Sequence, residues 1–168
     1  MAYNNFFIIV ALLLFGFVHS QEKNVNWSIL IDGKMENLFN SKIVAEYDNG
    51  NIDTYPVKLI PGELIILSND YSKILKAGNI KKIVLKFEFA KVCKDIKYYD
   101  YEIPIFNSWL SQSYFVLNIY NLDLKSNRKL YTPLPNKNYN YQYEFPNSGS
   151  RIIQKKLTKE QKKCNNNN

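Results

Sequence analysis

Apolar and polar residues alternate over most of this chain after residue 20, as they do in strands that bury one face. The alternation is clearest over 25–31, 81–90, 98–105 and 139–145. The segment 114–122 is apolar on both faces, which is typical of a strand in the middle of a sheet. Turn residues separate these segments at intervals of about 8–12 residues. The pattern therefore predicts an all-β protein.

Two segments have the signals of helices instead. Tyr71, Ile74 and Leu75 recur with helical spacing, and Gly78 follows them as a stop signal, which predicts one short internal helix. Near the end of the chain, Thr158 can begin a short helix rich in lysine. The prediction is therefore a β protein with two small helices.

Smaller signals indicate turns and edges. Asn49-Gly50 stands between two alternating segments and predicts a hairpin turn, because these residues accept positive φ angles. Pro56 and Pro104 have no N–H to give to a ladder, so each predicts an edge strand. We also expect a short strand over 128–131.

About eight to ten short strands without a βαβ rhythm predict an antiparallel β-sandwich, immunoglobulin-like or similar. A small closed β-barrel produces the same kind of pattern and is the alternative. We expect three parts along the chain: a signal peptide over 1–20, the sandwich domain over 21–156, and a basic, Asn-rich tail over 157–168.

The first twenty residues have the features of an export signal. Phe6–Val18 is an apolar run broken only by Gly16, and the small residue Ser20 stands where a signal peptidase cuts. The run is shorter than the roughly 20 apolar residues that cross a bilayer, and no later segment approaches that length. The alternative to a cleaved signal peptide is an uncleaved membrane anchor. We expect an exported protein, extracellular or periplasmic, with Gln21 as its first residue.

The chemistry that the sequence allows is narrow. The only histidine, His19, lies in the leader, so cleavage removes the partner of Ser-His and Cys-His pairs and the usual ligand of zinc and copper. Asp100 and Glu102 share one face of an expected strand and are the candidates for a carboxylate-dependent hydrolase, although the alternation also fits two solvated charges. We expect no catalytic residue, metal or cofactor, and keep the hydrolase as the weaker alternative.

The last part of the chain is basic, and it contains one of the two cysteines. The net charge is +7, and much of it falls in 151–163, where the tail can contact acidic surfaces. Lysine dominates over arginine, and because lysine lacks the bidentate fork, nucleic acid is disfavoured as a partner. Cys93 and Cys164 can form a disulfide in an oxidising compartment, or remain two separate thiols.

Aromatic residues make up 15% of the chain and supply the best candidates for binding. Tyr139, Tyr141 and Tyr143 alternate with uncharged polar residues, and Trp109 stands in a Ser-rich connection. Exposed rings of this kind bind a protein or a polysaccharide through large, rigid contact areas. The alternative is that the same side chains form the core face of a strand and pack over the edge of the core.

One short motif concerns modification. Asn26-Trp27-Ser28 matches the acceptor pattern for N-glycosylation, which has meaning only in a eukaryotic secretory pathway.

These observations favour a secreted or periplasmic, non-enzymatic domain that binds a macromolecule through exposed aromatic residues and lysines. The alternative is a structural or assembly accessory of a cell-envelope or surface complex, with the basic tail as its docking segment.

Overall fold

The computed structural model describes residues 21–92, 95–152 and 154–155. Most of these residues are in strands, with two α-helices and one 3₁₀ turn between them. In chain order the elements are β1 (Glu22–Ile31), β2 (Lys34–Met35), β3 (Leu38–Tyr47), β4 (Ile52–Ile60), β5 (Glu63–Leu67), α2 (Ser68–Lys76), β6 (Ile80–Val92), β7 (Ile96–Ile105), η1 (Asn107–Ser111), β8 (Phe115–Asn121), α3 (Lys125–Leu130), β9 (Tyr139–Phe145) and β10 (Ser148–Ser150).

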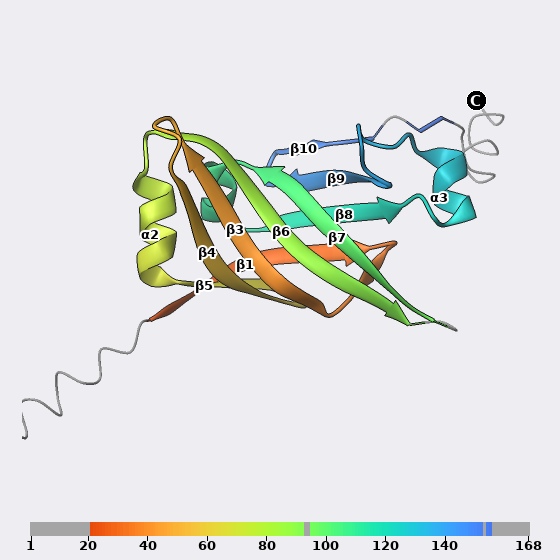
Figure 1. Ribbon diagram of the computed structural model, residues 1–168, viewed down its shortest axis with the longest axis horizontal. Helices are drawn as coiled ribbons and strands as arrows, with labels where there is room; N and C mark the ends of the chain where they lie inside the picture. Colours follow the sequence, from red (N-terminus) through yellow and green to blue (C-terminus); the bar gives the residue numbers. More distant parts are fainter. Residues whose placement is uncertain (1–20, 93–94, 153, 156–168) are drawn as a thin grey trace, which may run out of the picture.

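The strands of the described part form a single ten-stranded sheet in the order β10-β9-β8-β1-β5-β4-β3-β6-β7, with the short β2 beside β1. This sheet curls into a half-barrel, so that β7 lies over β8 and β9 (Figure 1). The all-β prediction is confirmed. One continuous curled sheet is found in place of the two stacked sheets of a sandwich, and β1 runs parallel to β8, so the sheet is mixed and not purely antiparallel.

The sheet curls because strands exchange partners along their length. Residues 22–26 of β1 pair with β5, whereas residues 27–31 pair with β8. In the same way, residues 52–56 of β4 pair with β3, and residues 57–60 pair with β5. A twisted strand that serves two neighbours in succession turns a corner between them. The register therefore builds the curvature.

The concave face of the curled sheet holds the core. The inward positions are those that the alternation predicts: on β1 they are Val25, Trp27, Ile29 and Ile31, all at most 7% exposed. The β6 strand contributes its alternating apolar residues in the same way, and Phe87 packs on Tyr101 of β7 with ring centroids 5.2 Å apart. Period-two patterning thus identifies the buried faces of β1, β6 and β7 correctly.

Helix α2 covers the end of the half-barrel that lies opposite α3 (Figure 1). Its Ile74 is completely buried, and the hydroxyl of Tyr71 donates to the carbonyl of Leu110 in η1 at 3.3 Å. The predicted internal helix is therefore confirmed. The predicted strand over 128–131 is wrong, because α3 occupies Lys125–Leu130.

Several predictions lie outside the described residues: the signal peptide over 1–20 with His19, the pairing of Cys93 with Cys164, and the basic tail with its helix over 157–168.

Candidate binding site

The four aromatic residues singled out in the sequence divide between two places. Tyr139, Tyr141 and Tyr143 follow one another on the concave side of β9, and Trp109 lies in η1. Tyr139 and Trp109 are 4% and 5% exposed, and Tyr141 and Tyr143 are half-buried against the core. Trp109 and Tyr143 are in contact, with ring centroids 4.3 Å apart. The row is therefore part of the packing: Tyr139 is buried, and Tyr141 and Tyr143 reach the surface only in part.

Tyr139 closes the gap between the free edge of β7 and strand β9. Its hydroxyl oxygen accepts a hydrogen bond from the main-chain N–H of Glu102 and donates one to the Glu102 carbonyl, both at 3.0 Å. The ring also packs edge-on against Tyr101, with centroids 5.1 Å apart. A single side chain thus satisfies the two outward main-chain groups that an additional strand would otherwise pair.

Trp109 is the centre of an aromatic cluster, which consists of Phe106, Trp109, Phe115, Tyr143 and Phe145. The Trp109 ring lies 4.9 Å from the ring of Phe115, 5.4 Å from Phe106 and 6.1 Å from Phe145. The rings of Tyr143 and Phe145 are parallel within 2° at 6.0 Å. Aromatic pairs at these separations add to the stabilisation that burial alone provides.

Phe106 differs from the other members of this cluster because its side chain is 64% exposed. It follows Ile105, which is buried at the end of β7. Because successive residues of a strand face opposite sides, Ile105 and Phe106 cannot both point inward. The adjacent pair of large apolar residues was a signal for an outward Phe106 that alternation analysis of whole segments overlooked.

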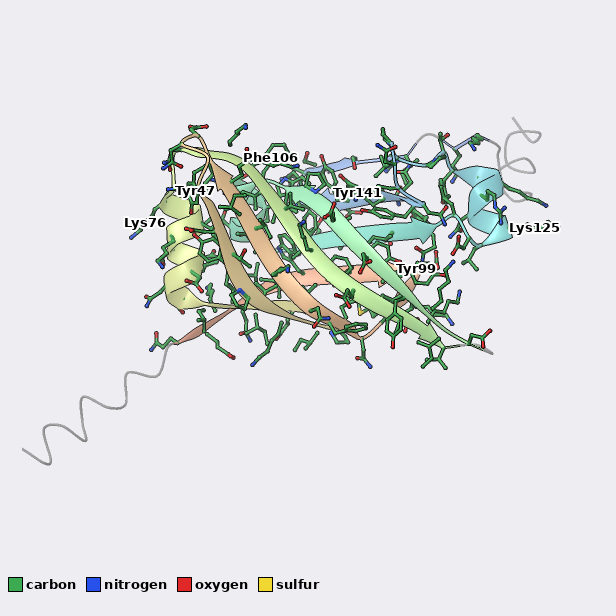
Figure 2. The ribbon with its side chains drawn as sticks, viewed as in Figure 1. Tyr47, Lys76, Tyr99, Phe106, Lys125 and Tyr141 are labelled. Carbon is green, nitrogen blue, oxygen red and sulfur yellow. The ribbon has the colours of Figure 1, made fainter. Side chains whose placement is uncertain are left out.

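A groove of about 310 Å³ adjoins Phe106. Its apolar lining comes from the start of β6 and the end of β7, with Ile80, Ile83 and Pro104 among the contributors, while Lys81 and Lys82 supply charge. Figure 2 shows Phe106 and Lys76 in the half of the molecule that holds α2, whereas Lys125 lies at the opposite end. The candidate binding site consists of Phe106 and this groove.

The two lysines of the groove differ in their partners. The Lys81 ammonium donates to a carboxylate oxygen of Glu46 at 2.6 Å, which raises the pKa of Lys81. Lys82 is exposed and makes no ion pair with any residue that the structure describes. The groove therefore presents one cation that is available to an anion on a partner.

Asp100 and Glu102 lie on the convex face, beside a cavity of about 660 Å³ that Lys42 and Lys86 also line. The ammonium groups of Lys137 and Lys86 each lie 2.7 Å from a carboxylate oxygen of Glu102. Hydrogen bonds from these two lysines lower the pKa of Glu102 to about 2. Glu102 is therefore a carboxylate at neutral pH and does not act as a proton donor there, which leaves it only the base or nucleophile role of a two-carboxylate site.

No known protein family, curated protein or solved structure matches the chain. Within residues 21–92, 95–152 and 154–155, no helix has the length and apolar character needed to cross a membrane.

Proposed function

We propose that this protein is a secreted or periplasmic, non-enzymatic binding domain that docks a protein partner at Phe106 and the groove beside it. The partner would contribute an apolar side chain flanked by Asp or Glu. The observation that carries the proposal is the contrast between Phe106, which is 64% exposed, and Trp109 directly behind it, which is 5% exposed.

An exposed phenylalanine held against a buried tryptophan is suited to anchor a partner. The edge-to-face contact of the two rings, at 5.4 Å, restricts Phe106 before any ligand arrives. Association then costs less side-chain entropy than it would at a freely rotating ring. The few residues that dominate interface energies are enriched in large side chains, aromatic ones among them, that become buried in well-packed pockets on binding.

The charge around the groove favours an acidic partner. Lys82 is exposed at the groove, and Lys76 ends α2 one residue before Ala77, which lines the groove. Exposed lysines on a partner surface mainly accelerate encounter and select against basic ligands. An apolar side chain between carboxylates satisfies both the groove and the lysines, whereas a neutral polysaccharide leaves the lysines without a counterion.

A panel of synthetic peptides tests this proposal, each with one Leu or Phe between Glu and Asp residues, and with fluorescence anisotropy as the readout. Phe106→Ala is expected to weaken binding by roughly thirtyfold, which corresponds to about 2 kcal/mol. The matched control is Tyr98→Ala, because Tyr98 is 63% exposed but lies away from the groove. Equal losses in both variants, or no binding to any acidic peptide, would contradict the proposed site.

The charge component is tested separately. Lys82→Glu is expected to weaken binding and to reduce its salt dependence, whereas Lys125→Glu at the opposite end should leave both unchanged. If the two reversals have the same effect, the attraction comes from net charge and not from the groove.

Export is part of this proposal and has its own test. N-terminal sequencing of the secreted protein should find Gln21 first. A protein that retains Met1 would contradict cleavage.

A further inference from the structure

The single glycosylation motif of this chain lies on β1. No other asparagine in the sequence is followed two residues later by Ser or Thr. Trp27 in the middle of the motif is 1% exposed and belongs to the core, so its neighbours Asn26 and Ser28 face the convex side of the sheet. The strand thus holds Trp27 inside, and it holds Asn26 and Ser28, the two residues that define the acceptor motif, outside.

Asn26 has space around it because β1 changes partners at this point. It is the last residue that pairs with β5, opposite Glu63, and pairing with β8 begins only at Trp27. On the β8 side, the Asn26 amide nitrogen meets the carbonyl of Ser113, which precedes β8, at 3.2 Å. The side chain is exposed, and β5 flanks this position on one side only, because β8 has not yet begun on the other.

The hydrogen bonding of Asn26 allows a substituent on its nitrogen. The amide nitrogen has two hydrogens, and the bond to Ser113 uses one of them. Replacement of the other by a sugar carbon still leaves one N–H as a donor for this hydrogen bond. A substituted Asn26 therefore keeps its contact, buries no new polar group and leaves Trp27 in the core.

We propose that Asn26 carries an N-linked oligosaccharide when the chain passes through a secretory pathway with a lipid-diphosphate-linked oligosaccharide donor. This rests on the export part of the proposed function and is independent of the Phe106 site. In the transfer, a bond forms between the Asn26 nitrogen and the first sugar carbon, the bond from that carbon to the diphosphate oxygen breaks, the nitrogen loses one proton, and the lipid diphosphate leaves. The transfer precedes folding, since β1 is paired with β5 at Asn26 afterwards.

The test expresses the full chain in a eukaryotic secretory host and measures the mass of the secreted protein before and after peptide N-glycosidase. We expect one glycan, whose release converts Asn26 to aspartate in the peptide map. Asn26→Gln and Ser28→Ala should each abolish it. Asn24→Gln is the matched control, because Asn24 is exposed on the same face of β1 but begins no acceptor motif.

The outcomes separate this proposal from the others. A secreted protein in which the Asn26 peptide is entirely unmodified overturns it. If the natural leader gives no secretion, the same measurement on the chain behind an unrelated leader decides the matter, and only the export proposal has failed. Loss of peptide binding at Phe106 in a glycosylated protein would leave the Asn26 proposal intact.

Discussion

The hydroxyl of Tyr101 donates a hydrogen bond of 2.7 Å to the side-chain oxygen of Asn121, and neither residue is more than 2% exposed. Asn121 in turn donates to Asp32 from its main chain, at 2.9 Å, and from its amide nitrogen, at 3.0 Å. Asn127 at the start of α3 donates to the same Asp32 carboxylate at 2.6 Å. The network connects β7, β8, α3 and the turn after β1, which are distant in the sequence.

Asn121→Leu should destabilise the protein by about 3 kcal/mol, because the Tyr101 hydroxyl loses its partner in the core. Urea unfolding of this variant, of Tyr101→Phe and of the double variant forms a thermodynamic cycle. The double variant should cost clearly less than the sum of the two single-variant losses, because it leaves neither the Tyr101 hydroxyl nor the Asn121 side-chain oxygen in the core without its partner. Additive losses would show that the two side chains act independently.

Tyr139→Phe should destabilise the protein by about 1–3 kcal/mol, because both main-chain groups of Glu102 lose their hydrogen bonds while the ring packing stays. Amide hydrogen exchange at Glu102 should become faster in this variant. Tyr141→Phe is the control, since the Tyr141 hydroxyl makes no hydrogen bond within the described chain. Unchanged exchange at Glu102 would mean that Tyr139 does not protect this edge.

Trp109→Ala should cost about 3–5 kcal/mol of stability, because it leaves a cavity among the four rings that surround Trp109. Phe106→Ala should cost less than about 1 kcal/mol, since this ring is mostly exposed. Thermal unfolding of both variants checks the difference. A large loss in Phe106→Ala would make Phe106 a packing residue and remove the reason for proposing it as an anchor.

The ion pairs of Glu102 predict a pH-dependent contribution to stability. The pKa of Glu102 falls from 4.5 to about 2 in the folded protein, so the stabilisation is complete above about pH 4.5 and is lost as the pH falls toward 2. Because the carboxylate is partly exposed, we expect only about 0.5–1 kcal/mol from it.

Urea unfolding of Glu102→Gln across this pH range measures the effect. The variant should be less stable than the wild type at pH 7, and the difference should disappear near pH 2. Glu88→Gln is the control, because Glu88 neighbours the same cavity without an ion pair among the described residues. A difference that persists at low pH would assign the effect to packing.

Alternation predicted strands and their inward faces well, because it depends only on which side of each strand meets the core. Alternation could not predict which strands pair with one another. Nothing in the Trp27–Ile31 segment indicates that it pairs in parallel with Phe115–Ile119. Pro104 correctly predicted the edge strand β7, whereas Pro56 lies in β4 at the point where pairing passes from β3 to β5. A missing N–H is tolerated at an outer edge and also at such a change of partner.

The candidate site was predicted in part. The sequence singled out Trp109 and Tyr143, which the fold brings into contact, but their burial comes from elements η1 and β9 that no local pattern relates to each other. Phe106 was missed because period-two analysis assigns residues within strands, and Phe106 stands just after one. In the 128–131 segment the local pattern indicated a strand, whereas the structure has helix α3, whose Asn127 makes a tertiary hydrogen bond to Asp32.

The position of β1 has a consequence for the order in which the protein can form. It is the first strand that the structure describes, yet it lies inside the sheet between β5 and β8. During synthesis, β1 has only the two-residue strand β2 as a neighbour until β5 appears. Its other edge stays open until β8 has been synthesised. Completion of the sheet is thus a late, non-local event, and we expect refolding on the millisecond-to-second scale typical of such topologies.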